Sequence, residues 1–183
     1  MLISPFSFSS KQSERKFTFF FLVLLFLGIT VMRFFDSFLV NEICTGGITS
    51  FELAKDVSVS EAILNSWDET ARLAAAFSTG FDYLFLFIYS TFIAILIHKL
   101  NERLWKDTSF YRFGVLLIYI QFVAALFDAI ENVGMMQLLF GNIEQFWTSI
   151  SFYFATIKFL LILAGISYIL INFSVFLIKK VKK

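Results

Sequence analysis

The sequence has very few of the residues from which disulfide, metal and nucleophilic sites are built. Its 183 residues include one cysteine, Cys44, one histidine, His98, and one proline. A single cysteine cannot form an internal disulfide or a thiolate cluster around a metal. The only histidine stands beside Lys99 at the end of an apolar run. It is interpreted as a residue of the membrane boundary, which argues against catalysis by a Ser–His pair.

The sequence also lacks the patterns typical of nucleotide, metal and hydrolase sites. It contains no GxGxxG, GxxxxGK[ST], HExxH, CxxC or GxSxG motif. The net charge is only +1, which gives no indication of nucleic-acid binding. Asp82, Asp128 and Glu131 could offer oxygen ligands to a hard metal ion, but Lys158 would compete with the metal for them. We therefore predict no metal and no cofactor.

What the sequence has in abundance is apolar side chains. Hydrophobic residues make up 58% of the chain, with 27 phenylalanines, and the mean hydropathy is +0.80. Soluble domains are usually about 45–50% apolar. The length favours one compact membrane domain rather than several. We predict an all-α membrane protein, a bundle of four transmembrane helices with an extracytoplasmic amphipathic segment between the first two.

Four apolar runs are long enough to cross a bilayer, which takes about 20 residues of helix. We expect spans at about residues 17–40, 73–100, 113–140 and 147–178, between a cytoplasmic tail at 1–16 and a basic cytoplasmic tail at 179–183. The first run follows basic residues, as in a signal peptide. It is rich in Phe and Leu, however, and no small-residue cleavage site follows it, so it is interpreted as an uncleaved span.

The longest polar section separates the first two runs. The letters CTGG at residues 44–47 indicate a turn, and apolar residues are interspersed with charged ones through residues 50–70. This pattern predicts an amphipathic element that lies flat on the bilayer or folds over the bundle as a lid. Four residues are assigned to this lid or to the rim beneath it: Arg33, Asp36, Glu52 and Trp67.

Basic residues are distributed unevenly between the two ends of the predicted spans. Residues 1–16, the connection at 101–112 and the tail at 179–183 are rich in Lys and Arg. The connection between the first two spans carries mainly acids, and the connection between the last two carries Glu144 and no base. By the positive-inside rule, both termini are predicted to lie in the cytoplasm.

The third apolar run carries polar residues that are costly inside a bilayer. Asp128, Glu131 and Asn132 stand at spacing i, i+3 and i+4, so they share one helix face. An isolated charge at the bilayer centre costs about 2.5–3.5 kcal/mol on insertion scales, so such groups need partners or a polar cavity. Asp82 and Lys158 fall in the same outer half of the predicted membrane. Lys158 is expected to pair with Asp128 or Glu131, with Asp82 facing them.

These positions predict one inward-facing polar pocket in the outer half of the bilayer. Acids outnumber bases there, which favours a cationic or hydroxylated ligand such as a small amphiphile, a lipid or a cation. Eight residues are expected to bind this ligand: Asp82, Tyr83, Tyr89, Gln121, Asp128, Glu131, Asn132 and Lys158. The expected partners are membrane lipids and this ligand, and the oligomeric state is left open.

Two other functions are compatible with the same residues. In an intramembrane enzyme acting on a lipid or isoprenoid, Glu131 or Asp128 would be the general acid or base and Lys158 would stabilise developing negative charge. In a structural or assembly subunit, the ion pairs would only fix helix register and packing, or form a partner interface.

Three stretches together resemble a family of small four-span bacterial inner-membrane proteins. They are FELAKDVSVSEAILNSWDETARLAAAFSTGFDYLFLFIYS, FDAIENVGM and ATIKFLLILAGISYIL, and the resemblance covers roughly residues 51–170. The residues that carry it are Trp67, Asp82 with Tyr83, Asp128 with Glu131 and Asn132, and Lys158. This resemblance implies a grouping and a place in the inner membrane of a bacterium, but no particular chemistry. The architecture is also similar to emopamil-binding/sigma-2-receptor-like membrane proteins. No motif of theirs is matched residue by residue, so that likeness implies fold analogy alone.

Overall fold

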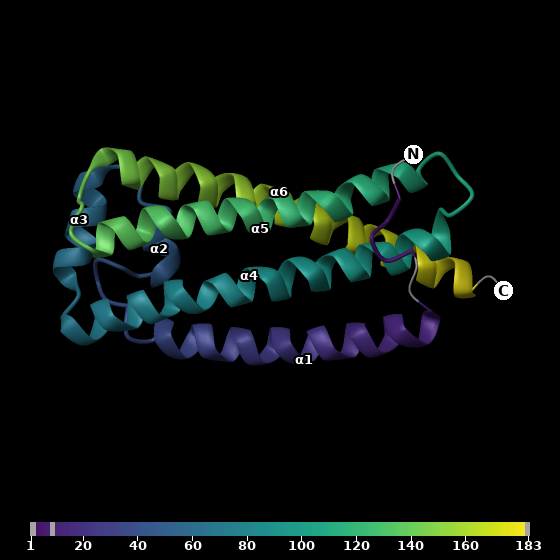
Figure 1. The fold of residues 1–183 in the computed structure, drawn as a ribbon, viewed down its shortest axis with the longest axis horizontal. Helices are drawn as coiled ribbons and strands as arrows, with labels where there is room; N and C mark the ends of the chain where they lie inside the picture. The colour runs from purple at the N-terminus through teal and green to yellow at the C-terminus, as the bar shows by residue number, and fades with distance from the viewer. Residues whose placement is uncertain (1–2, 8–9, 182–183) are drawn as a thin grey trace.

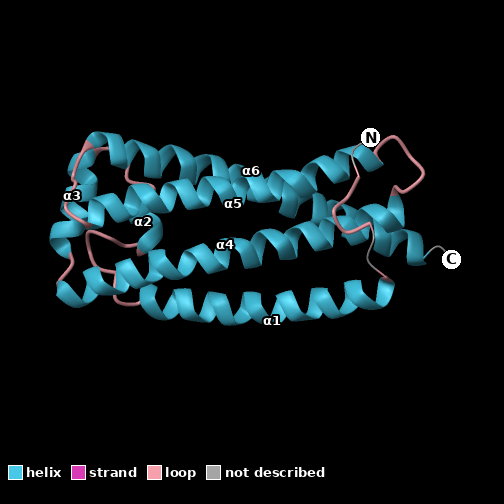
Figure 2. Cartoon of the chain, in the orientation of Figure 1, coloured by secondary structure: helices cyan, strands magenta, loops and turns pink. Residues whose placement is uncertain are grey.

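The fold is helical throughout the part of the chain that the structure describes. The structure, a computed structural model, describes residues 3–7 and 10–181, and these form helices and loops without a strand (Figures 1 and 2). The helices are α1 (Lys11–Asp36), α2 (Ile48–Glu52), α3 (Val57–Ser66), α4 (Glu69–Leu104), α5 (Tyr111–Leu139) and α6 (Gln145–Val181). The predicted all-α class is confirmed.

Four of these helices, α1, α4, α5 and α6, are long and apolar enough to cross a membrane, as predicted. Helix α4 has 36 residues, which is about 54 Å at 1.5 Å per residue. It therefore extends well beyond a hydrocarbon core of about 30 Å. It also exceeds the expected range of 73–100 at both ends, whereas α1 ends at Asp36, before residue 40.

Local capping groups account for several helix ends. Ser10 Oγ accepts a hydrogen bond from Ser13 N at the start of α1, and Asp68 Oδ1 accepts one from Ala71 N at 2.8 Å at the start of α4. Each bond satisfies a backbone N–H that has no partner within its helix. Gly141 follows α5 with a φ of 93°, a conformation that favours glycine and reverses the chain toward α6.

Helices α4 and α5 form the centre of the bundle, and α1 is its outermost long helix. Helix α5 packs along both α4 and α6, whereas α1 packs chiefly on α4 (Figure 1). The approach of α1 to α4 is close at Gly28, where an added Cβ would lie 2.6 Å from Phe85 Cδ2. Away from α4, the surface of α1 carries large exposed side chains such as Phe26, which is 71% exposed.

Residues 37–68, which we call the cap, cover one end of the bundle. The cap contains α2, which contacts α5 and α6, and α3, which contacts α6. Phe51 and Trp67 are buried in one apolar cluster with Leu138 of α5, and Trp67 Nε1 donates a hydrogen bond to the Leu39 carbonyl at 2.9 Å. The amphipathic element expected at residues 50–70 is therefore two short helices joined by a loop and packed onto the bundle.

Cys44 is a structural residue of the cap. Its side chain is fully buried, and Sγ donates a hydrogen bond to the Gly47 carbonyl at 3.1 Å. Desolvation by burial, helped by the nearby Asp36 carboxylate, raises the pKa of this thiol to about 11. The thiol is therefore neutral at physiological pH.

The opposite end of the bundle, which we call the terminal end, carries both chain termini (Figure 1). Here the N-terminal segment folds back, so that Ser4 Oγ lies 2.9 Å from His98 Nδ1, and His98 Nε2 lies 3.5 Å from Glu14 Oε1. The order Ser–His–Glu resembles that of a hydrolase triad, but the two ring nitrogens are exchanged, with Nδ1 toward the serine and Nε2 toward the acid. Ser4 and His98 are also each only 1% exposed. His98 is thus a buried residue that holds the N-terminal segment against α4.

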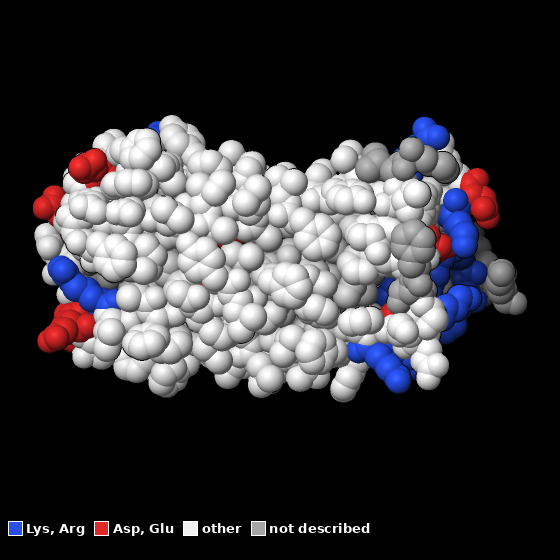
Figure 3. All heavy atoms as spheres, in the orientation of Figure 1, with Lys and Arg blue, Asp and Glu red and all other residues white. Residues whose placement is uncertain are grey.

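On the face drawn in Figure 3, charged side chains gather at the two ends of the molecule, with a broad uncharged band between them. Lys and Arg predominate at the terminal end, whereas Asp and Glu predominate at the cap end in this view. An uncharged band of this kind fits burial of the middle of the bundle in a bilayer.

Candidate functional site

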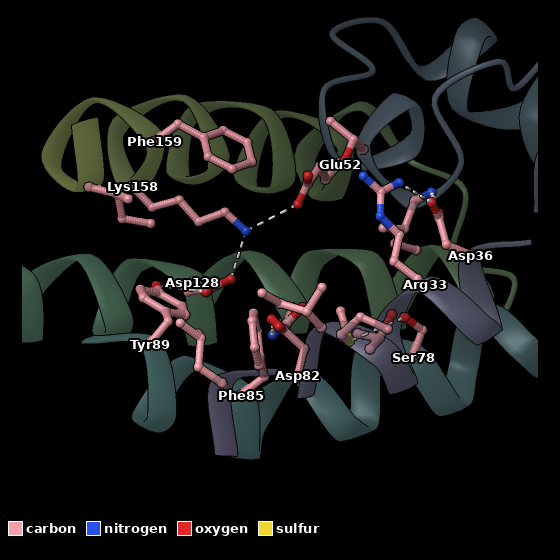
Figure 4. Close-up of a pocket in the computed structure, with 18 of the residues that line it drawn as sticks. Arg33, Asp36, Glu52, Ser78, Asp82, Phe85, Tyr89, Asp128, Lys158 and Phe159 are labelled. Carbon is pink, nitrogen blue, oxygen red and sulfur yellow. Dashed lines mark hydrogen bonds and ion pairs between the residues drawn. The ribbon is translucent and has the colours of Figure 1, made fainter. Parts of the chain in front are cut away.

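The site is centred on Lys158, which α6 places in the interior of the bundle (Figure 4). Its Nζ lies 2.7 Å from Asp128 Oδ1, 2.7 Å from Glu131 Oε2 and 3.1 Å from Glu52 Oε2. None of these four side chains is more than 7% exposed. Lys158 therefore pairs with both acids named from the spacing, and with a third acid from the cap.

Helix α5 supplies three polar side chains to the network around Lys158, more than any other helix, because its polar face turns inward. Asp128, Glu131 and Asn132 are 2%, 0% and 0% exposed. At spacing i, i+3 and i+4 they share one face, and α5 is the helix that packs against both α4 and α6. Groups on this face therefore reach both neighbours.

Glu52 extends from the cap to the centre of the site, deeper than the lid or rim position assigned to it from the sequence. Helix α2 begins after Gly47, whose φ of 58° and close approach to the Asp36 carboxylate leave no room for a side chain. Phe51 anchors α2 in the apolar cluster of the cap. No residue spacing shows this contact, because it depends on how the cap folds onto the bundle.

Asp82 and Tyr89 of α4 complete the polar network. Tyr89 Oη donates a hydrogen bond to Asp128 Oδ2, and Asn132 Nδ2 donates one to Asp82 Oδ2, both at 2.8 Å. Within the described residues, no Lys or Arg nitrogen lies within 4.0 Å of Asp82. Asp82 thus faces the same centre without a cation of its own.

Two of the expected ligand-binding residues lie outside this network. Tyr83 is 42% exposed, and its hydroxyl donates to the Ala129 carbonyl at 3.2 Å. Gln121 is fully buried, and its amide donates to the Leu161 carbonyl at 3.2 Å, where Gly165 leaves room for it. We interpret both as contacts that hold helices together rather than as parts of the site.

The residues assigned to the lid or rim take different positions. Arg33 and Asp36 form an ion pair of 3.7 Å at the mouth of the site, with the Arg33 side chain 80% exposed (Figure 4). Asp36 Oδ1 also accepts a hydrogen bond from Ile48 N at 2.8 Å, which fixes the start of α2. Trp67 is 4% exposed in the apolar cluster of the cap and does not line the site.

A cavity of about 710 Å³ adjoins the network and lies between α1, α4 and α6. Its end near the cap is lined by polar groups, among them Glu52, Asp82, Asp128 and Lys158. Its remaining walls are apolar, with Phe92 and Leu96 of α4 opposite residues of α1 and α6. Leu96 lies about 21 Å from Asp82 along α4 at 1.5 Å per residue, so the cavity is long and polar at one end.

The polar end combines surplus negative charge with unsatisfied acceptors. Lys158 is the base among four buried carboxyl groups, those of Glu52, Asp82, Asp128 and Glu131. Within the described residues, Glu131 Oε1 and Asn132 Oδ1 accept no hydrogen bond. Buried acceptors of this kind are costly unless a donor reaches them. Glu52, Asp82 and Asp128 line the cavity, so a hydrogen-bond-donating cation there would meet acceptors. Glu131, expected to bind the ligand, is instead fully buried and does not line the cavity.

Lys158 occupies the place between the carboxylates that a metal ion would need. No group of three or more His, Cys, Asp or Glu side chains in the described part of the chain is arranged to hold a metal ion. The chemistry that this arrangement supports is therefore ion pairing, hydrogen bonding and proton transfer between neighbouring groups.

Comparison with known proteins gives no relative: no family model matches the chain, and neither a curated protein nor a solved structure is similar to it. The chain itself makes a four-helix bundle with candidate membrane spans and a charged interior.

Proposed function

We propose that this chain is an integral membrane protein that binds a small amphiphile in the cavity between α1, α4 and α6. The observation that carries the proposal is the polarity of that cavity, which has carboxylates at one end and apolar walls along the rest. A molecule with a polar head and a hydrocarbon chain matches both parts, and ligand sites combine apolar walls with a few placed polar groups in this way.

The head of this ligand is cationic or rich in hydrogen-bond donors. Three carboxyl groups share one lysine, and a fourth, that of Asp82, lines the cavity without a cationic partner in the described structure. A ligand ammonium beside Asp82 would offset part of the cost of burying that carboxylate. A carboxylate head would instead add to the excess negative charge.

We place the terminal end of the bundle in the cytoplasm of a bacterium and the cap outside its inner membrane. The basis is the excess of Lys and Arg at the terminal end (Figure 3), which follows the positive-inside rule. In this orientation the polar end of the cavity lies in the outer half of the bilayer, beneath the cap.

A ligand series that varies the head group and the chain length separately tests the proposal. We expect dodecylamine to raise the thermal unfolding midpoint of the protein in a neutral detergent, and dodecanol to raise it less. Butylamine, without a long chain, and dodecanoate, with the wrong charge, should not raise it. At a concentration 100 times Kd a ligand stabilises the folded protein by about 2.7 kcal/mol. If none of the four ligands raises the unfolding midpoint, the proposal is contradicted.

Two variants identify the ends of the cavity. Asp82→Asn should abolish the preference for the amine over the alcohol. Ile166→Trp fills the apolar part, because Ile166 lines the cavity, and it should weaken both ligands. The matched control is Leu160→Trp on the same helix, where the side chain is 60% exposed and does not line the cavity.

A second function, acid–base catalysis on a lipid, is favoured by the position of Asp128. This carboxyl group lies between Tyr89 Oη and Lys158 Nζ and borders the cavity, so a proton could pass along these hydrogen bonds to a bound molecule. Mass spectrometry of lipid extracts from cells that carry the native chain or the Asp128→Asn chain tests it. Catalysis requires a lipid whose amount differs between them, and identical extracts would contradict it.

A further inference from the structure

A second hollow lies at the terminal end. Its residue Lys99 is about 26 Å along α4 from Asp82, at the polar end of the first cavity, at 1.5 Å per residue. The hollow has a volume of about 740 Å³ and lies between the first turns of α1 and the last turns of α4. Five bases line it: Lys11 and Arg15 of α1, and Lys99, Arg103 and Lys106 of α4. We call it the basic cleft.

The acids of the basic cleft already have partners. Glu14 faces His98 Nε2 at 3.5 Å. Glu102 accepts a hydrogen bond from Tyr111 Oη and lies 3.4 Å from Lys106 Nζ. These contacts account for both acids and for one of the bases.

The other four bases line the cleft without an ion-pair contact among the described residues. Among the described residues, no carboxylate oxygen lies within 4.0 Å of Lys11, Arg15, Lys99 or Arg103. Lys99 Nζ donates a hydrogen bond to Thr18 Oγ1 at 3.1 Å, which holds it at the interface of α1 and α4. Like charges held together repel each other, so an anion placed among them would be stabilised.

The backbone of α1 adds to this positive field. Lys11 and Gln12, at the start of a 26-residue helix, both line the cleft. The first N–H groups of a helix and the positive end of its dipole favour phosphate and other anions. Side-chain charge and helix dipole thus point to the same kind of ligand.

We propose that the basic cleft binds the phosphate headgroup of an anionic membrane lipid. A lipid is the source that fits because the cleft stands where the charged end of α1 meets its apolar surface. Phe17, Phe19 and Phe20 follow Arg15 within two turns and are 54%, 68% and 55% exposed. Lipid chains can lie along these rings while the headgroup sits among the bases, the arrangement expected for basic residues at a membrane surface.

Native mass spectrometry of the full chain in a neutral detergent tests this proposal. Phosphatidylglycerol and phosphatidylcholine with identical acyl chains are the probes, and we expect selective retention of phosphatidylglycerol. Each Lys or Arg near an anionic surface changes affinity by roughly fivefold. The triple variant Lys11→Gln, Arg15→Gln, Arg103→Gln should therefore weaken phosphatidylglycerol binding on the order of 100-fold.

The matched control is the triple variant Lys16→Gln, Arg112→Gln, Lys180→Gln. It removes the same charge from the same end of the bundle but from residues that do not line the cleft. Its binding of phosphatidylglycerol should fall far less. Equal losses in the two triples would overturn the proposal, because binding would then follow net charge alone, and so would equal retention of the two lipids.

Competition by inorganic phosphate distinguishes a lipid from a soluble anion. Retention of phosphatidylglycerol should survive millimolar phosphate, because the lipid also gains contacts along α1. Full displacement by phosphate would overturn the assignment to a lipid. If the cleft triple fails to fold by circular dichroism, Arg103→Gln alone, at an exposed position, replaces it with an expected loss of roughly fivefold.

Discussion

At the scale of single residues, the decisive feature is one ammonium group shared by several acids. Lys158 Nζ contacts three carboxylates within 3.1 Å, so removal of the lysine leaves more unpaired charge than removal of any one acid. Breaking a buried pair by removing one partner is costly because the remaining charge is uncompensated. The loss of stability in each variant should therefore increase with the number of carboxylates that the substitution leaves without a cation.

We expect Lys158→Met to destabilise the protein by roughly 3–5 kcal/mol, the range for an uncompensated buried charge. Glu52→Gln should cost less, because Asp128 and Glu131 still pair with the lysine. Lys179→Met, the same change at the basic end of α6, is the control. Thermal midpoints in one detergent give the comparison, and a Glu52→Gln variant as damaged as Lys158→Met would contradict this charge count.

A second expectation at this scale concerns Cys44 and pH. Because burial raises the thiol pKa to about 11, the thiol is neutral below that pH, and because it is fully buried, reagents cannot reach it. A water-soluble maleimide should therefore fail to label the folded protein from pH 6 to 9 and should label it after denaturation.

The raised pKa of the Cys44 thiol also affects stability, because it stabilises the folded protein while the thiol is neutral. That contribution is lost as pH rises through the unfolded value, near 8.5, toward about 11.

At the scale of the elements, the four long helices follow directly from the apolar runs, whereas the short ones do not. A run of about 20 apolar residues leaves few alternatives to a membrane-spanning helix. Helix α2 has five residues, too few for any periodic pattern, and it is fixed by the buried Phe51 and by Gly47. That is why Glu52, at its end, is assigned to the rim from the sequence although it reaches Lys158.

The contact between α1 and α4 can be tested at Gly28. An added side chain there would meet the ring of Phe85 at 2.6 Å, so Gly28→Leu should destabilise the protein by about 1–3 kcal/mol through overpacking. Phe85→Ala in the same chain should recover part of that loss. Gly80→Leu on α4, where nothing lies within 4 Å of the added Cβ, is the control. Equal thermal midpoints for both leucine variants would show that α1 does not pack closely on α4.

At the scale of the whole molecule, two sites of opposite character lie at different depths of one bundle. The polar end of the cavity, beneath the cap, has an excess of acids, and the basic cleft at the terminal end has an excess of bases. An uncharged band separates the ends (Figure 3). If the positive-inside rule holds, the basic cleft faces the anionic inner leaflet, and the cap faces outward.

Cysteine labelling in intact cells measures this orientation. In a Cys44→Ala background, Lys55→Cys in the cap should react with a membrane-impermeant maleimide added outside. Lys106→Cys at the terminal end should react only after permeabilisation. Both positions are exposed, so accessibility in the folded chain is matched. The reverse pattern would place the acidic pocket in the inner half of the membrane and would contradict the orientation we propose.

The sequence alone determined the class of fold and the face on which the acids of α5 lie. Both are local properties of the chain. A long apolar run forms a helix long enough to cross a bilayer, and helical periodicity puts Asp128, Glu131 and Asn132 on one face. Only the tertiary structure decided which of those groups meet. Lys158 reaches Glu52 across 106 positions of the chain, while Tyr83 and Gln121 turn to backbone carbonyls instead. Such contacts depend on how helices are rotated and how the cap folds over them, and these are set by packing between distant segments.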